Sequence, residues 1–158
     1  MLYLKRKWYK MIKELITKET IRFAESAENW EEAIRIGAEP LIEIGVIGAG
    51  YIDDIIKNVK EKGPYIVIYP GLALPHARSE HAYATGLSYL RLNEPVDILD
   101  RPDRSAQVFI TLSATDNTTH LEAMRELAKI LVNKEYLERF LNAQNVEDVL
   151  SIIDETIS

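Results

Sequence analysis

The chain contains three histidines and no cysteine, so any covalent chemistry must use oxygen or nitrogen atoms. One histidine, His76, ends an apolar segment in the stretch PYIVIYPGLALPHARSEHA. Pro75 has a fixed φ and biases Leu74 toward an extended conformation, so the imidazole is carried on a stiff segment. A neutral imidazole is nucleophilic, and the reference pKa of about 6.5 leaves a large neutral fraction near pH 7. His76 can therefore take a phosphoryl group; the alternative interpretation is a structural histidine at a strand end.

Two polar residues after His76 fit a phosphate ligand. Arg78 carries a planar fork of donors that matches phosphate oxygens, and Ser79 adds a hydroxyl donor. The alternative for Arg78 is a surface ion pair. A serine hydrolase built from His76 with Ser79 or Ser113 lacks the G-x-S-x-G motif that would support it.

A second histidine follows a helix start signal in TDNTTHLEAM. With Asn117 as the expected N-cap, His120 lies in the first helical turn, where backbone N–H groups lack partners and a cation is disfavoured. We expect His120 to stay neutral and to donate an N–H to a phosphoryl group or oxyanion. The alternative is an exposed first-turn residue without function. The third histidine, His81, is interpreted as a solvated side chain in a polar loop.

The elements that must position these residues alternate in type. Apolar periodicity and turn residues predict strands at residues 20–27, 65–69, 87–92 and 107–113, with His76 in a loop after the second. Helices are predicted at 30–44, capped by Asn29, at 51–60, from Asn117 onward, near 136–141 and at 146–157. Pro40 should kink or divide the first helix, and residues 93–104 form a polar loop. The pattern indicates one α/β domain, with a mixed β-sheet flanked by helices on both faces.

Composition excludes several classes of function. A net charge of −6 argues against nucleic acid as a partner, and no stretch is apolar enough to span a membrane. Three histidines without cysteines at ligand spacing predict no metal site, and no cofactor is expected. Residues 1–10 lack the apolar core of a secretory signal, which favours a cytoplasmic protein. They are either an N-terminal extension or the start of the first helix, and the domain is expected to occupy residues 11–158.

The stretch GPYIVIYPGLALPHARSEHAYATGLSYLRLNEPV, followed by DNTTHLEAMRELAKILVN, resembles the EIIA domain of the mannitol/fructose class (type 2) of the phosphoenolpyruvate-dependent sugar phosphotransferase system. The PHAR and GPYIVI segments are most like the ascorbate branch of that class. The resemblance covers nearly all of the chain from about Met11 and rests on paired motifs.

The resemblance implies a phosphocarrier, that is, a phosphotransferase component. His76 matches the ALPH histidine, which accepts a phosphoryl group from the carrier HPr as a tele-phosphohistidine and passes it to a cysteine of an EIIB partner. His120 matches the histidine that supports the phosphoryl group. We expect HPr and EIIB to compete for an apolar docking surface made of Leu72, Leu74 and Pro75.

Further expectations concern the wider system. Through EIIB the chain would serve an EIIC membrane permease for ascorbate or a related sugar or polyol, and a homodimer is compatible with the resemblance. The alternative is a regulatory EIIA-like module that signals its phosphorylation state through protein contacts. Mannitol-type members carry an arginine upstream of the active strand, whereas the nearest basic residues here are Lys57, Lys60 and Lys62.

Overall fold

The computed structural model describes residues 11–157, within which the strands form one five-stranded sheet in the order β1-β4-β5-β3-β2. The pairs β1/β4 and β3/β5 are parallel, and the pairs β4/β5 and β2/β3 are antiparallel, so the predicted mixed sheet is confirmed. The strands are β1 (Ile21–Ala24), β2 (Val67–Tyr69), β3 (Gly71–Ala73), β4 (Gly86–Asp97) and β5 (Ser105–Ser113). The expectation for residues 1–10 lies outside the described residues.

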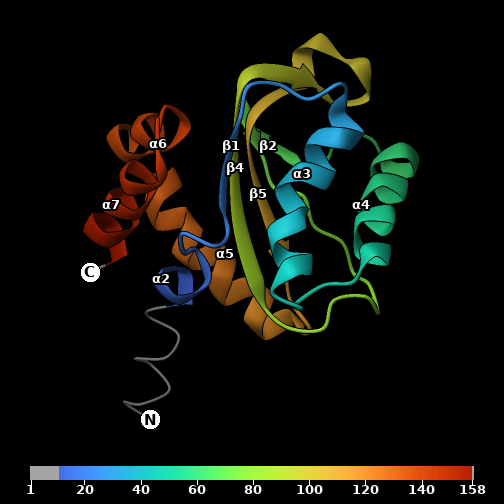
Figure 1. Cartoon of the computed structure of the whole chain (residues 1–158), viewed down its shortest axis with the longest axis horizontal. Coiled ribbons are helices and arrows are strands. Elements are labelled where there is room, and N and C mark those ends of the chain that lie inside the picture. Colours follow the sequence, from blue (N-terminus) through green and yellow to red (C-terminus); the bar gives the residue numbers. More distant parts are fainter. Residues whose placement is uncertain (1–10, 158) are drawn as a thin grey trace.

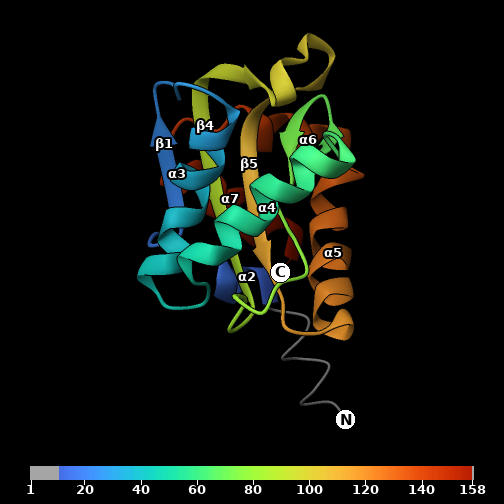
Figure 2. The same cartoon turned by 90° about the vertical axis from the view of Figure 1, so that its right-hand side faces the viewer.

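Helices cover both faces of the sheet, as predicted. One layer consists of α3 (Trp30–Glu43) and α4 (Ala49–Lys62), and the other of α2 (Met11–Leu15), α5 (Asn117–Leu131), α6 (Lys134–Leu141) and α7 (Val146–Ile157) (Figure 1). Turned by 90°, the molecule shows α4 crossing in front of the sheet (Figure 2). Each layer buries its own apolar core against the sheet, the first around Ile34 and Ile55 and the second around Leu127 and Phe140. None of the helices described is long and apolar enough to cross a membrane.

The first long helix begins where the sequence predicts. The Asn29 side chain accepts a hydrogen bond from the backbone N–H of Glu32, as an N-cap does. The expected division of this helix at Pro40 is wrong, because α3 continues through Pro40 to Glu43. Only three helical residues follow Pro40, so few helical hydrogen bonds lie beyond the proline. Pro40 and Leu41 are also buried against the sheet, which stabilises this end of the helix.

The strand region before the loop that follows β3 and carries His76, which we call the active loop, differs from the prediction. Residues 65–69 were expected to form a buried strand, but β2 begins at Val67 and lies at the sheet edge, with Ile68 and Tyr69 exposed. A turn at Gly71, whose φ is +89°, reverses the chain. It leads into β3, which was expected to be loop. This three-residue strand pairs with β5 and is the one that leads to His76.

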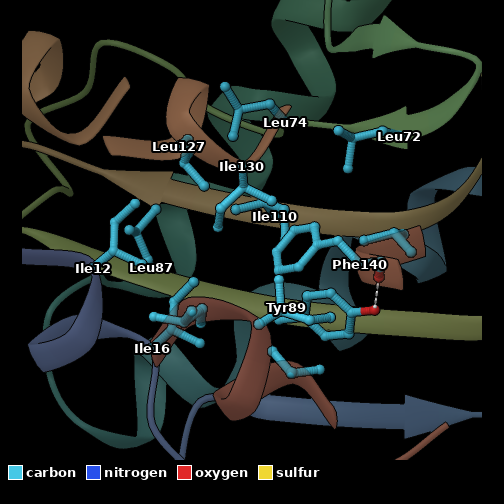
Figure 3. Close-up of a cluster of buried hydrophobic side chains, with 14 of the residues drawn as sticks. Ile12, Ile16, Leu72, Leu74, Leu87, Tyr89, Ile110, Leu127, Ile130 and Phe140 are labelled. Carbon is cyan, nitrogen blue, oxygen red and sulfur yellow. Dashed lines mark hydrogen bonds between the residues drawn. The ribbon is translucent and has the colours of Figure 1, made fainter. Parts of the chain in front are cut away.

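The proposed docking surface of Leu72, Leu74 and Pro75 is wrong. Side chains alternate between the two faces along β3, so Leu72 and its second neighbour Leu74 point into the core under α5, while Ala73 faces the α4 layer. Leu72 and Leu74 are each only 1% exposed, and Figure 3 shows both among the packed side chains of that core. Pro75 is buried as well. These buried residues support the loop that carries His76, and they are not accessible to a partner protein.

The predicted polar loop at residues 93–104 is partly strand. β4 continues to Asp97 and pairs with Ser105 across the sheet, which makes it longer than predicted. The remainder forms two short 3₁₀ turns, Ile98–Asp100 and Pro102–Arg104. This part of the chain lies at the far end of β5 from the start of α5 (Figure 1).

Candidate functional site

The His76 imidazole has a defined tautomer. Its Nδ1 lies 2.5 Å from the carbonyl oxygen of Leu74. A carbonyl can only accept, so Nδ1 carries the proton and donates it, and the lone pair of the neutral ring is left on Nε2. The loop is tied to the sheet directly before His76, because the Pro75 carbonyl accepts the backbone N–H of Leu112 at 3.0 Å. The stiff segment expected from the sequence therefore holds a ring whose nucleophilic atom is Nε2.

A hollow of about 590 Å³ lies against this ring. Its lining comes from α4, from the segment before β2, from the loop after β3, and from the stretch that runs from the end of β5 into the first turn of α5. The lining residues on the first two segments are Tyr51, Asn58, Lys62 and Tyr65; on the other two they are His76, Ala77, Arg78, Ser79, Leu112, Ala114, Thr115, Asp116, Asn117 and His120.

The structure brings the two predicted histidines together. The ring centroids of His76 and His120 are 5.7 Å apart. The N-cap of α5 is Asp116, not Asn117, since the Asp116 carboxylate accepts the N–H and the hydroxyl of Thr119. His120 is therefore one position deeper in the helix than expected, and its own N–H donates to the Asp116 carbonyl.

The expectation that His120 stays neutral is supported, although by another cause. Burial lowers the pKa of His120 below its usual 6.5, and the neighbouring His76 and Arg78 lower it further. The helix dipole is not needed to explain this direction. Among residues 11–157 no hydrogen-bond partner of the His120 ring is found, so its N–H is available to a ligand in the hollow.

Arg78 and Ser79 have different surroundings. Arg78 is exposed and lines the hollow, and its Nη2 donates to Asn117 Oδ1 at 3.0 Å. The hydroxyl of Ser79 donates to Asp54 Oδ2 at 2.5 Å and accepts the backbone N–H of His81. A hydroxyl has one proton to donate, so in this arrangement Ser79 braces the loop and does not offer a donor to phosphate. The expected phosphate contact is retained for Arg78 alone.

His81 lies outside the hollow and is not fully solvated. Its side chain is 39% exposed, and its ring packs on the start of α4 so closely that a Cβ at Gly50 would come within 2.6 Å of His81 Cδ2. The His81 carbonyl accepts the N–H of Gly48 at 2.9 Å. His81 lies in a turn, in keeping with the predicted polar loop, but its side chain is only partly solvated and packs on the start of α4.

Of the three lysines upstream of the active strand, Lys62 is the one that lines the hollow. Lys60 pairs with Glu31 at 3.4 Å, and Lys57 lies beside it in a separate groove between α3 and α4. The last turn of α4 thus places an exposed cation at the site that contains His76.

Three residues of the hollow were missed by sequence reasoning. The Tyr65 hydroxyl donates to the His76 carbonyl at 2.5 Å, and burial raises the pKa of Tyr65. The Tyr51 hydroxyl accepts the Ala77 N–H at 3.1 Å, and burial raises the Tyr51 pKa to about 12. Asn58 also lines the hollow. Tyr51, Asn58 and Lys62 are spaced seven and four residues apart, which puts them on one face of α4. This polar stripe was the sequence signal from which Tyr51 and Asn58 could have been predicted as site residues.

No group of three or more histidine, aspartate or glutamate side chains that could hold a metal ion is found in the part of the chain that the structure describes. The lining of the hollow offers a nucleophilic imidazole nitrogen, a second neutral imidazole, and the cations Arg78 and Lys62. This set suits a phosphoryl group, which needs in-line positioning and charge stabilisation.

Comparisons with known proteins identify similar sequences and folds. The family model for the phosphoenolpyruvate-dependent sugar phosphotransferase system, EIIA 2, matches residues 14–156. The ascorbate-specific PTS system EIIA component of Escherichia coli K12 is 32% identical over 149 residues, which are 93% of this chain and 97% of the relative. The mannitol-specific cryptic phosphotransferase enzyme IIA of Escherichia coli, 31% identical, superposes with a TM-score of 0.83 over 91% of this chain and 98% of its own.

A more distant neighbour is the complex of enzyme IIA(Mtl) with phosphorylated enzyme IIB(Mtl) from Escherichia coli, 23% identical, with a TM-score of 0.76 over 89% of this chain and 99% of that chain. At that identity it shows the fold alone. The family match over nearly the whole chain and the 32% identity to a curated relative lead to one conclusion: this chain belongs to the EIIA 2 family of the phosphoenolpyruvate-dependent sugar phosphotransferase system.

Proposed function

We propose that His76 accepts a phosphoryl group on Nε2 from the phosphohistidine of an HPr-type carrier and passes it to a cysteine of an EIIB partner. The observation that carries the proposal is the Nδ1 to Leu74 carbonyl bond, which leaves the Nε2 lone pair facing a hollow shared with His120. The regiochemistry follows from this bond, because the proton on Nδ1 prevents attack from that nitrogen.

The transfer is a displacement at phosphorus. The Nε2 lone pair forms the new N–P bond while the donor's N–P bond breaks, and that electron pair returns to the donor ring nitrogen. His76 then carries positive charge on a ring that keeps its Nδ1 proton, and the Leu74 carbonyl stabilises that charge. Arg78 and Lys62 neutralise the charge on the phosphoryl oxygens, and the neutral His120 donates an N–H to one of them.

Partners must approach from the open side of the hollow, since the residues beneath His76 are buried. Leu121 follows His120 directly in α5 and is 55% exposed, and it replaces the buried leucines as the apolar docking contact of the proposal. The choice of EIIB as the acceptor is supported by the complex of enzyme IIA(Mtl) with phosphorylated enzyme IIB(Mtl), whose IIA has the same fold. HPr and EIIB need the same Nε2 atom, so we expect them to compete, which an NMR titration with both partners measures.

We assign ascorbate, or a related sugar or polyol, as the substrate of the transport system that this chain would serve. Support comes from the ascorbate-specific EIIA relative at 32% identity. The permease EIIC would complete the system. Growth on ascorbate of a strain lacking its own ascorbate EIIA, restored by this chain and not by its His76→Ala variant, would support the assignment; restoration of mannitol growth alone would contradict it.

The direct test is incubation with phosphoenolpyruvate, Enzyme I and HPr, followed by intact mass measurement. We expect one added phosphate that is labile in acid and stable in base, and none on His76→Ala. The variant should remain folded, because His76 lies in a loop and its ring is only partly buried. Phosphate uptake by His76→Ala would remove His76 as the acceptor.

The alternative is a regulatory module that accepts the phosphoryl group and signals its state by protein contacts. Such a module keeps His76 and the hollow, so both functions give the same result in the first assay. They differ in the next step: a transport component passes phosphate to EIIB within seconds of mixing, whereas a regulatory module retains it. Adding purified EIIB to the phosphorylated chain distinguishes them.

A further inference from the structure

The peptide bond that follows the acceptor histidine is held at both ends by tyrosine hydroxyls. The His76 carbonyl accepts a hydrogen bond from the Tyr65 hydroxyl at 2.5 Å. The N–H of the same peptide unit, which belongs to Ala77, donates to the Tyr51 hydroxyl at 3.1 Å. A peptide unit is planar and turns as one body, so two bonds at its opposite ends restrain the same rotation.

The two tyrosines are themselves fixed. Tyr51 is 1% exposed, and its hydroxyl donates to the Leu112 carbonyl at 2.6 Å, which ties the peptide to β5 in the middle of the sheet. Tyr65 is half-buried and lines the hollow beside the last turns of α4. The Tyr65 ring also meets the His76 ring edge to face, with centroids 5.3 Å apart and planes at 87°. One tyrosine thus restrains both the backbone and the ring of His76.

We infer that Tyr51 and Tyr65 form a clamp that positions His76 for phosphoryl transfer. This inference rests on the proposed phosphocarrier role of His76. The clamp fixes the backbone on the C-terminal side of His76, while the Nδ1 to Leu74 bond fixes the ring against the backbone on the other side. With both restraints in place, Nε2 keeps one direction into the hollow before any partner arrives. Tyr51 and Tyr65 are positioning residues, because neither supplies the reacting atom.

Rotation of the His76 peptide is the motion that the clamp prevents, and it would be costly for the reaction. Any shift of the His76 Cα atom that accompanies this rotation moves the imidazole away from the Leu74 carbonyl and weakens the bond that defines the tautomer. The single proton of the neutral ring could then lie on either nitrogen, and Nε2 would no longer point in one fixed direction toward the phosphoryl group. Displacements of about 1 Å at a reacting centre can cost on the order of a hundredfold in rate.

The test compares Tyr65→Phe, Tyr51→Phe and the double variant with wild type. Tyr69→Phe is the matched control, because Tyr69 is a nearby exposed tyrosine outside the hollow. Loss of one neutral hydrogen bond predicts that each single variant lowers the single-turnover rate of transfer from phospho-HPr by about three- to tenfold. The KM for HPr should stay at the wild-type value, since neither hydroxyl faces the partner. Tyr69→Phe should match wild type in both.

A second measurement tests the effect of the clamp on the His76 tautomer and does not require phosphoryl transfer. Long-range ¹H–¹⁵N spectra of the unphosphorylated protein report which His76 nitrogen carries the proton. We expect the Nδ1–H form to dominate in wild type and in Tyr69→Phe, and to lose population in Tyr65→Phe. If wild type takes no phosphate at all, the proposed function fails, but this spectrum still decides whether the clamp exists.

The double variant tests whether the two hydroxyls restrain the same peptide. With one end still held, rotation is limited, so removal of both hydroxyls should lower the rate by more than the product of the single effects. A loss equal to that product would mean that the hydroxyls act on separate features and would overturn the clamp. Wild-type rates and wild-type His76 spectra in Tyr65→Phe would overturn it as well, whatever the core substitution Tyr51→Phe does to folding.

Discussion

The two walls of the hollow hold their polar groups in different ways. The α4 wall, made of Tyr51 and Asn58 on α4 and of Tyr65 just after it, directs its two hydroxyls at backbone atoms of the active loop and of β5. The α5 wall, made of Asp116, Asn117 and His120, presents side chains at a helix start, and its one bond to the active loop joins Arg78 to Asn117, both exposed. One wall is tied to the core and the other faces solvent.

The difference suggests a division of labour between the walls. Bonds from buried hydroxyls to backbone persist whether or not a ligand is present, so the α4 wall can fix the nucleophile in advance. An exposed bond between an arginine and an amide is weak and easily exchanged, so Arg78 can leave Asn117 when a phosphoryl group offers a charged partner. Lys62 is the exception on α4, because it is exposed and its role is that of a charge.

If the division holds, changes beneath His76 reduce stability, whereas changes on the α5 wall reduce rate. The largest effect is expected for Leu74→Ala, which leaves a cavity in the core and should lower the free energy of unfolding by about 2–5 kcal/mol. Urea denaturation measures it. The matched control is Leu121→Ala, a leucine 55% exposed, for which we expect a change within about 0.5 kcal/mol.

The affinity for HPr should depend on these two leucines in the opposite order from stability. Leu121→Ala should weaken HPr binding, and Leu74→Ala should leave the affinity of the folded fraction unchanged. Equal stability of the two variants would contradict the assignment of Leu74 to the core and would restore it to the docking surface.

Much of the architecture could be predicted from the sequence, because it depends on patterns over many residues. Helical periodicity and a local cap such as Asn29 identify α3 and α7 almost to the residue. The failures involve short or ambiguous signals. β3 has three residues after a Pro-Gly turn, too few for any alternation to be read. Its central position in the sheet, which buries Leu72 and Leu74, is a tertiary property that its sequence does not encode.

The site divides in the same way. His76 and His120 could be found because each stands beside a local signal, a proline-stiffened strand end and a helix start. The shift of the N-cap from Asn117 to Asp116 is within the uncertainty of two adjacent capping residues. Tyr51 and Tyr65 were missed because they contact the backbone of residues 76 and 77, and the polar stripe on α4 that includes Tyr51 does not identify those backbone partners.

On the α5 wall, the largest expected change in rate comes from His120→Ala. Removal of one preorganised donor typically costs about a hundred- to a thousandfold, so transfer from phospho-HPr to His76 should slow by that amount while stability changes little. His120→Gln retains an N–H donor at similar reach and should recover part of the rate. Stopped-flow or quench-flow transfer rates for the three forms provide the measurement. Wild-type rates in His120→Ala would leave the α5 wall without a part in the chemistry.

A smaller change in rate is expected for Arg78→Ala. Loss of a charged hydrogen bond to the phosphoryl group predicts a rate about ten- to a hundredfold lower. Arg78→Lys keeps the charge and loses the fork, so it should lie between Ala and wild type. In the unphosphorylated protein both substitutions should leave the His76 ring spectra unchanged, because Arg78 belongs to the exchangeable contacts. Altered His76 spectra would show instead that Arg78 also positions the His76 ring. The α4 wall would then not be the only part of the hollow that fixes the nucleophile in advance.

The smallest effect concerns stability against pH. Burial, followed by His76 and Arg78, lowers the pKa of His120 in the folded chain, whereas the unfolded chain keeps the ordinary value of about 6.5. Below pH 6.5 the unfolded state therefore binds this proton more readily than the folded state. The contribution of neutral His120 to stability should be fully present above about pH 6.5 and lost as the pH falls through the lower folded value.

The control for this titration is His120→Gln, which removes the proton-binding group. The difference between the unfolding free energies of wild type and His120→Gln should be flat above about pH 6.5 and should decrease below it. Measurements stay above pH 5, because hydrogen bonds from Thr119 hold the pKa of Asp116 below its ordinary range and its contribution is lost only at lower pH. A difference that rises on acidification would mean that a folded partner stabilises protonated His120. The α5 wall would then present a cation, and His120 would attract the phosphoryl group by charge as well as by its N–H.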